Sequence, residues 1–508
     1  MIGPRRWAIT AGIVAAALLV SGCTALSSSP AAISTPTGEN VAEDLEGFYS
    51  QRLEWTTCEG EFQCATATAP LDWNDPGRES IDLALIRSTA SGDRLGSLLV
   101  NPGGPGGSGY DFVRDSLEFA VSEPVRERYD TVGFDPRGVN RSSAVSCYSE
   151  PAELDDFLFG LPQNPVGSDA YIAELAESSK EFGQACLTHT GDLLEFVDTV
   201  SAARDLDLLR SILGDEKLNY LGYSYGTLLG ATYADLYPDK TGRLVFDGAV
   251  DPATTEFDVT ATQAAGFESA MRAYLADCAT TAACPFSGSV DEAMVEIRSL
   301  LDSLNTSPIR ATDGRQLGGG AMFTAIILPL YSVSNWPYLG DLFTSVMAGD
   351  ADYAFLLADS YYSRGEDGTY ADNSTESFVA INCLDYASTS TPDSLKAEAA
   401  QLAVIAPVFG PSMSYGGSGC ADWPFSSTRE RGPIAASGSG PILVVGTTND
   451  PATPYVWAQN LAGQLENGTL VTYNGEGHTA YNKSNACVDD TVDAYLIDGT
   501  VPEADPDC

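Results

Sequence analysis

Ser224 lies between two glycines in the motif GYSYG (222–226), directly after an apolar run from Leu218 to Tyr223. A helix-favouring stretch follows the motif as far as Leu236. A serine on a tight turn from strand to helix must adopt a strained backbone, and the flanking glycines let the chain bend and let neighbouring backbone approach. This order predicts a mostly parallel sheet with crossover helices, and a nucleophilic serine exposed at the end of one strand.

Two histidines occur in the chain, so the choice of a general base is narrow. A serine hydroxyl is a weak nucleophile near neutral pH and needs such a base within hydrogen-bond reach. His189 precedes the motif and lies beside Cys186, which favours a structural or surface role. His478 follows the strand-like run Leu470–Tyr473 on the glycine-rich loop GEGHT. We therefore predict that His478 carries the proton.

The imidazole also needs a carboxylate that fixes its tautomer and stabilises its charged form. Asp450 follows the strand-like run from Ile442 to Gly446 and precedes His478. Asp247, at the end of the earlier run from Arg243, is the rival. The chain order serine, acid, histidine is that of α/β-hydrolases, in which the acid usually follows the next-to-last strand, so Asp450 is the predicted acid.

A glycine-rich stretch, NPGGPGGSG (101–109), follows another strand-like run where esterases of this architecture place an oxyanion-binding loop. Each N–H donor to such an oxyanion is worth about 3–4 kcal/mol. Pro105 has no N–H, so Gly104 is the predicted donor, together with the N–H of Tyr225. A phosphate-binding loop is the competing interpretation, but the stretch lacks the lysine of a Walker motif.

Strand-like and helical patterns alternate along most of the chain. The remaining expected strands are near Ile81–Arg87 and Thr131–Asp135, and a last helix is expected to begin near Asn485. From about Pro252 to Gly432 helical stretches such as 264–278 and 290–304 replace this alternation. We predict an α/β core over 44–252 and 433–508, interrupted by a mainly helical cap over 253–432; a separate domain is the alternative.

The first 22 residues have the parts of an export signal, with Arg5 and Arg6 before an apolar run from Trp7 to Val20. Cys23 follows at once, as in a bacterial lipobox, so we predict a diacylated Cys23 and a flexible tether over 23–43. An ordinary signal peptide with a chance cysteine is the alternative. With a diacylated Cys23, the folded body would lie in the cell envelope and would be held to the membrane through the lipid alone.

Without Cys23, ten of the 11 cysteines remain, and an even number in an exported chain suggests five disulfides. The close pairs 58/64 and 278/284 suggest bridges between sequence neighbours. Zinc is disfavoured because two histidines and no paired C-x-x-C leave the usual ligand spacings unmet. A net charge of −44 argues against nucleic acid as a partner, because phosphates would be repelled.

Several long motifs occur in a characteristic order: NPGGPGGSG (101–109), DPRGVNRS (135–142), GYSYGT (222–227), DGAVDP (247–252), NDPATP (449–454) and GEGHT (475–479). From about Cys58 to Cys508 the chain resembles the actinobacterial tripeptidyl-aminopeptidase branch of the proline iminopeptidase family. The resemblance implies an α/β-hydrolase core with a helical cap, a Ser-Asp-His triad and no metal or organic cofactor. Asn101-Pro102 replaces the histidine of the HGGPG motif, so strict proline specificity is not implied.

The same resemblance implies that peptides or proteins are the substrates and that short peptides are released from free N-termini. A carboxylesterase or lipase acting on envelope lipids is the alternative, because the same triad serves esters. A catalytically idle surface lipoprotein is a third hypothesis. A free amine requires a carboxylate near the cap, and Asp385 is our candidate because Cys383 would fix its backbone. A surface carboxylate or helix cap is the competing role of Asp385.

Overall fold

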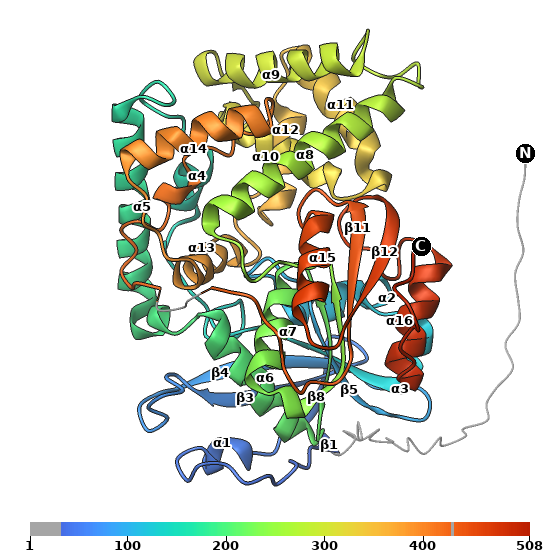
Figure 1. Ribbon diagram of the computed structural model, residues 1–508. Helices are drawn as coiled ribbons and strands as arrows, with labels where there is room; N and C mark the ends of the chain where they lie inside the picture. The colour runs from blue at the N-terminus through green and yellow to red at the C-terminus, as the bar shows by residue number, and fades with distance from the viewer. Residues whose placement is uncertain (1–31, 428–430) are drawn as a thin grey trace, which may run out of the picture.

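The computed structural model describes residues 32–427 and 431–508, so the expected signal peptide and Cys23 lie outside the described residues. A ten-stranded sheet forms the centre, in the order β1-β2-β3-β4-β6-β5-β7-β8-β11-β12. The strands from β1 to β6 pair antiparallel in the order β1-β2-β3-β4-β6, and β6-β5-β7-β8-β11-β12 are parallel. This mostly parallel sheet with flanking helices is the architecture that the sequence predicted (Figure 1).

Seven of these strands were expected from the sequence. They are β4 (Ser80–Ser88), β5 (Gly96–Asn101), β6 (Tyr129–Phe134), β7 (Leu218–Tyr223), β8 (Thr241–Asp247), β11 (Ile442–Asn449) and β12 (Gly468–Glu476). Every residue of β5 and β6 is buried, because helices cover both faces of the parallel part. The antiparallel edge adds β1 (Ala32–Ile33), β2 (Glu54–Cys58) and β3 (Phe62–Pro70).

Helices pack on both faces of the sheet, and each face has its own apolar cluster. One face carries α6 (Thr199–Leu213), α7 (Tyr225–Leu236) and α15 (Tyr455–Gln464). The other carries α2 (Gly109–Ala120), α3 (Glu123–Arg128) and α16 (Ala486–Asp498), whose N-cap is the expected Asn485. The short α1 (Glu46–Tyr49) packs against α6 and β3.

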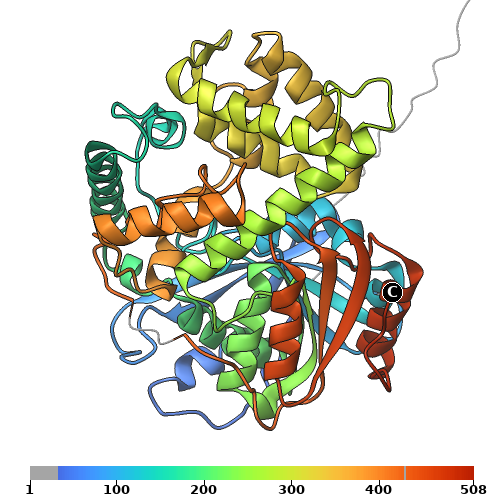
Figure 2. The same cartoon turned by 45° about the horizontal axis from the view of Figure 1, so that its top comes forward.

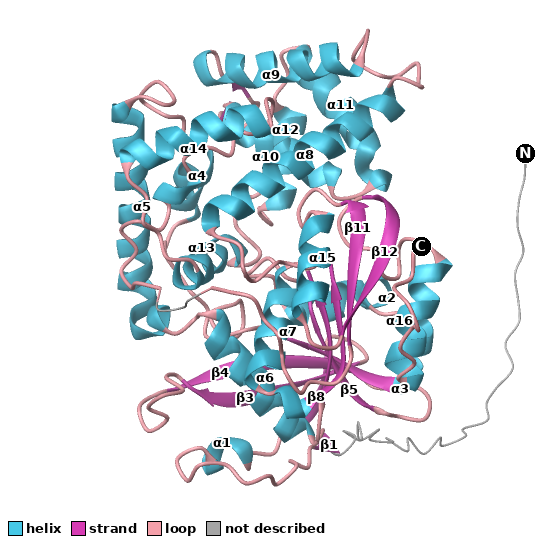
Figure 3. Cartoon of the chain, in the orientation of Figure 1, coloured by secondary structure: helices cyan, strands magenta, loops and turns pink. Residues whose placement is uncertain are grey.

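The chain between β8 and β11 is mainly helical, as Figure 3 shows. It contains α8 (Glu256–Cys278), α9 (Val290–Thr306), α10 (Gly319–Leu330), α11 (Trp336–Met347), α12 (Asp352–Tyr361), α13 (Ser374–Asp385) and α14 (Pro392–Ile405), with a small hairpin of β9 (Ile309–Arg310) and β10 (Gln316–Leu317). Helices α8 to α12, residues 256–361, share an apolar core separate from those of the sheet. We call these helices the outer cap; Figure 2 shows them above the sheet.

A second helical segment precedes the nucleophile strand and was not separated from the core by the sequence pattern. It consists of α4 (Pro151–Phe159) and α5 (Asp169–Thr190), which lie beside the cap in Figure 1. Phe159 belongs to the outer-cap core and meets Phe355 edge-on, with ring centroids 5.7 Å apart. Part of the first core segment, 44–252, therefore packs with the cap.

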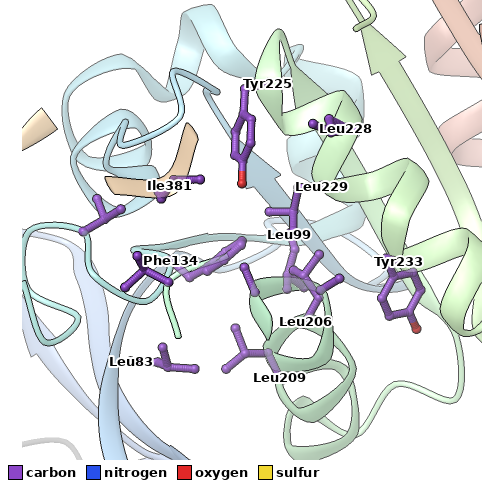
Figure 4. Close-up of a cluster of buried hydrophobic side chains, with 14 of the residues drawn as sticks. Leu83, Leu99, Phe134, Leu206, Leu209, Tyr225, Leu228, Leu229, Tyr233 and Ile381 are labelled. Atoms are coloured by element: carbon purple, nitrogen blue, oxygen red, sulfur yellow. The ribbon is translucent and has the colours of Figure 1, made fainter. Parts of the chain in front are cut away.

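Helix α13 differs from the outer cap because its buried face joins the apolar core of the sheet. Figure 4 shows Ile381 of α13 beside this cluster, which includes Leu83, Phe134 and Tyr225. Ile381 is only 2% exposed. The cap is thus fastened to the sheet through α13, whereas its outer helices pack mainly with one another.

Residues from Ala32 onward include part of the segment that was expected to be a flexible tether. The tether expected over 23–43 does not extend freely from Ala32 onward, because β1 pairs with β2 and Glu39 forms an ion pair with Arg210.

All ten cysteines from Cys58 onward are paired, as Cys58–Cys64, Cys147–Cys186, Cys278–Cys284, Cys383–Cys420 and Cys487–Cys508. This confirms the five expected bridges. Within the described ranges, no helix is both long and apolar enough to cross a membrane.

Candidate active site

Ser224 occupies the sharp turn between β7 and α7, with φ 54° and ψ −125°. A non-glycine residue in this region is strained and must be held by its surroundings. The glycines on either side leave the space that this turn needs. A Cβ on Gly222 would come 2.5 Å from the carbonyl oxygen of Gly226, and a Cβ on Gly226 would come 2.8 Å from Asn101 Oδ1. The motif is therefore required by close packing around the serine.

His478 and Asp450 form a hydrogen-bonded pair at the carboxyl ends of β11 and β12. Nδ1 of His478 lies 3.0 and 2.9 Å from the two oxygens of Asp450. The carboxylate is almost completely buried, at 2% exposure, and it also accepts the N–H groups of Ala452 and Thr453 at 2.9 and 2.8 Å. The Thr453 hydroxyl lies 3.2 Å from Nδ1 of His478 and donates to Asp450. These contacts fix the ring with Nε2 facing away from Asp450.

Asp247 is the last residue of β8, and Gly248 follows it; the first lies against the serine turn and the second against the histidine. The N–H of Ser224 donates to the carbonyl of Asp247 at 2.9 Å. A Cβ on Gly248 would stand 3.1 Å from Cε1 of His478. Ser224 and His478 therefore lie next to adjacent residues of the chain, Ser224 to Asp247 and His478 to Gly248.

The glycine-rich stretch 101–109 crosses directly over the nucleophile. A Cβ on Gly103 would lie 2.9 Å from the Cβ of Ser224 and 3.0 Å from the N atom of Tyr225. The N–H of Gly103 donates to Asn101 Oδ1 at 2.9 Å, so that donor already has a partner. This geometry is compatible with the predicted pair of oxyanion donors, the N–H groups of Gly104 and Tyr225.

The outer cap contacts the histidine directly. The N–H of His478 donates to the carbonyl of Tyr331, at the end of α10, at 2.9 Å. The two rings are tilted by 45° with centroids 5.5 Å apart. On the acid side, Gln263 of α8 donates to the carbonyl of Ala452 at 2.8 Å. Sequence reasoning missed Tyr331, because no local motif marks a residue that acts through its carbonyl.

Asp385 lies at the end of α13 and is 1% exposed. One of its oxygens accepts the N–H of Thr199 at 3.0 Å, and the other accepts the Thr199 hydroxyl. That hydroxyl also lies 2.5 Å from the hydroxyl of Tyr225. Asp385 therefore joins α13 to α6 and to the residue that follows the nucleophile. These contacts favour a role in the joint between cap and sheet, and its role as an amine anchor stays a prediction.

Asp247, the rival acid, and His189, the rival base, are not part of the Asp450–His478 pair. Asp247 is fully buried, and its carboxylate accepts backbone N–H groups of Ala480 and Tyr481 at 2.8 to 3.0 Å. Burial raises the pKa of Asp247. His189 is exposed in the last turn of α5. Among the residues that the structure describes, no group of three or more His, Cys, Asp or Glu side chains is arranged to hold a metal ion.

Comparison with known proteins gives consistent matches along the chain. Residues 96–303 match the family described as "alpha/beta hydrolase fold", and residues 406–508 match the "TAP-like protein" family. The chain is 36% identical to the serine protease Hip1 of Mycobacterium tuberculosis, over 99% of this chain and 98% of that protein. It is 35% identical to carboxylesterase B of the same species, with 88% and 86% of the two chains covered.

The chain is also 29% identical to the tripeptidyl aminopeptidase of Streptomyces lividans, covering 90% of this chain and 86% of that protein. Among solved structures, an α/β hydrolase enzyme from a deep-sea metagenome library matches at 14% identity with a TM-score of 0.34, covering 88% of this chain and 98% of the other. The sequence relatives span nearly the whole chain, including the cap.

Proposed function

Because the chain belongs to the α/β-hydrolase family that includes the mycobacterial serine protease Hip1, we propose that it is an exported, lipid-anchored serine hydrolase that releases short peptides from free N-termini. The observation that carries the hydrolase chemistry is the hydrogen-bonded pair of the buried Asp450 and His478, near the strained turn of Ser224. The peptide specificity is supported by the names of two relatives, a serine protease and a tripeptidyl aminopeptidase.

In this proposal, Ser224 attacks the scissile carbonyl while Nε2 of His478 takes the hydroxyl proton. Asp450 holds the tautomer with Nδ1 protonated and stabilises the imidazolium that forms. The N–H groups of Gly104 and Tyr225 stabilise the oxyanion. His478 then gives its proton to the leaving amine, and the acyl group stays on Ser224 until water, activated by the same imidazole, releases it.

The first test compares Ser224→Ala with wild type on a small activated ester and on a peptide anilide. We expect Ser224→Ala to lose several orders of magnitude on both substrates with an unchanged circular dichroism spectrum. Ser299→Ala, an exposed serine of α9, is the matched control and should retain wild-type turnover. Turnover that persists in Ser224→Ala after repurification would reject the proposed chemistry and favour the idle-lipoprotein hypothesis.

The second test separates the peptidase from an esterase. Matched tripeptide anilides with free and acetylated N-termini are incubated with the enzyme, and the products are identified by mass spectrometry. Release from the free peptide alone supports the exopeptidase. A carboxylesterase is the second candidate, because carboxylesterase B is 35% identical to this chain. It would hydrolyse esters and leave both anilides intact.

The envelope anchor is proposed from Cys23 and the preceding apolar run. The five disulfides support export, because such bridges form and persist in oxidising compartments. The net charge of −44 gives the protein no electrostatic attraction to an anionic membrane, so the acyl chains on Cys23 would be its only hold. We expect Cys23→Ala to move the protein from the membrane fraction to the soluble fraction. Equal membrane binding by both forms would contradict the anchor.

A further inference from the structure

The backbone on both sides of His478 has positive φ, which is strained at Thr479. Gly477 has φ 101° and Thr479 has φ 64°. Positive φ is readily adopted by glycine but is strained for a β-branched residue such as threonine. Strain of this kind costs on the order of 1–3 kcal/mol for each residue and persists where the surroundings fix the chain. The position of the imidazole therefore depends on what holds residues 478–481.

Four successive N–H groups of this segment have acceptors from three different parts of the molecule. His478 donates to the carbonyl of Tyr331 in the cap, and Thr479 donates to Asp450 at 3.2 Å. Ala480 and Tyr481 both donate to the carboxylate of Asp247, at 3.0 and 2.8 Å. Two of the four hydrogen bonds that fix residues 478–481 are therefore accepted by the carboxylate of Asp247.

Asp247 is also bound to the nucleophile turn, because its carbonyl accepts the N–H of Ser224 at 2.9 Å. Its carboxylate is 0% exposed and is surrounded by N–H donors, which match the charged form of the carboxyl group. Hydrogen bonds from N–H groups to a buried carboxylate are about twice as strong as those between neutral groups. One residue therefore connects the turn that carries Ser224 to the segment that carries His478.

We propose that Asp247 is a positioning residue that sets the placement of His478 relative to Ser224 by binding the backbone of Ala480 and Tyr481. This inference rests on the proposed function and adds to it a role that differs from that of the triad acid. Asp450 orients the ring through Nδ1, whereas Asp247 places the backbone from which the ring extends. A histidine displaced by about 1 Å can lose up to about 10²-fold in rate, because proton transfer requires a narrow range of distances.

The test uses Asp247→Asn, which keeps the side-chain shape but replaces one acceptor oxygen by a donor. Turnover is divided by the number of active sites that a fluorophosphonate labels, so unfolded protein does not contribute. On a peptide anilide we expect kcat per labelled site to fall roughly 10- to 100-fold with KM within about twofold, since binding groups are untouched. On a nitrophenyl ester the loss should be at least several-fold smaller, because that leaving group departs without a proton from His478.

Asp215→Asn is the matched control. Asp215 also accepts a backbone N–H, that of Ser97 at 3.2 Å, but at the opposite end of the parallel strands. We expect it to lower thermal stability while kcat per labelled site stays at the wild-type value on both substrates. Asp247→Glu is the second variant if Asp247→Asn does not fold. It keeps the charge and moves the acceptor by one methylene, so it should show the same difference between anilide and ester.

These variants distinguish a failure of the proposed function from a failure of the inference about Asp247. If Ser224→Ala retains turnover, the proposed function is wrong, whatever the Asp247 variants do. If Ser224→Ala is inactive and the labelled sites of both Asp247 variants turn over like wild type, or lose anilide and ester turnover equally, Asp247 only stabilises the fold and the inference is wrong.

Discussion

The sheet and the outer cap are built on separate apolar cores, and they contribute to the active site in different ways. Ser224, Asp450, His478 and the glycine-rich loop all follow strands of the sheet. The outer cap reaches the site mainly through backbone and ring contacts, of which the carbonyl of Tyr331 on His478 is the most direct. The sheet therefore carries all the residues that we propose for catalysis, and the cap contacts them from above.

The largest expected effect is on the sheet side. Asp450→Asn should lower kcat by roughly 10³- to 10⁴-fold, because the amide supports the wrong tautomer of the imidazole. Glu268→Gln in α8 is the matched change in the cap, since Glu268 is also a buried carboxylate and accepts the N–H groups of Val408 and Phe409. Steady-state kinetics per labelled active site should leave Glu268→Gln within a few-fold of wild type. Similar losses in both variants would contradict the proposal that the catalytic residues lie on the sheet and not in the cap.

The next effect tests whether the two cores are separate units. Leu206 of α6 and Leu339 of α11 are both 0% exposed, the first in the sheet core and the second in the outer-cap core. Replacing either by alanine should cost about 2–5 kcal/mol of stability. Hydrogen exchange should then accelerate over 256–361 in Leu339→Ala and over the sheet strands in Leu206→Ala. Uniform acceleration over the whole chain in both variants would show a single cooperative core.

The difference between the two regions also explains what the sequence could predict. The strand β7 agrees with its expected limits because its mostly apolar run leads directly into the GYSYG motif. The edge strand β3, Phe62–Pro70, escaped notice because its threonines and alanines give no such run. Ser224 and His478 stood out through a motif and through the scarcity of histidine.

The contacts that position these residues could not be predicted, because they join distant parts of the chain. Asp247 was weighed as the rival acid, yet its carboxylate binds the backbone 233 residues further on. Asp385 was chosen for its closeness to Cys383, and that cysteine is indeed bonded to Cys420. Its partner Thr199, however, lies 186 residues away, and no local pattern indicates it.

Asp385 gives the third prediction, at the joint between cap and sheet. Asp385→Asn should lower stability by about 1–3 kcal/mol, because the buried oxygens that accept from Thr199 lose part of their hydrogen bonding. Since Thr199 also contacts the hydroxyl of Tyr225, turnover of a free-amine peptide and of a small ester should fall by the same factor. Thr199→Val, which removes the shared hydroxyl, should behave alike. A loss confined to the free-amine peptide would instead identify Asp385 as the amine anchor.

The fourth prediction concerns a carboxylate at the base of the sheet. Burial alone would raise the pKa of Glu39, but hydrogen bonds from Lys240 and Arg210 outweigh it and lower the pKa to about 2. A carboxyl group with a lowered pKa stabilises the fold above its ordinary value of 4.5 and loses that effect as the pH falls towards about 2. Wild type should exceed Glu39→Gln by about 1–2 kcal/mol at pH 7, allowing for solvent screening. The difference should vanish in urea denaturation near pH 2.

The smallest effect has the opposite sign and lies in the cap. Glu256 of α8 and Glu398 of α14 line a cavity of about 270 Å³. Burial raises the pKa of both groups, and the charge of Glu398 raises that of Glu256 further. Their charged forms therefore oppose folding at neutral pH, and protonation relieves this as the pH falls. Glu256→Gln should be more stable than wild type at pH 7, by up to about 0.5 kcal/mol, and equal to it once the wild-type carboxyl is protonated. Urea denaturation at pH 7 and at pH 4 measures both differences, and an advantage of the variant that grows on acidification would contradict the assignment of sign.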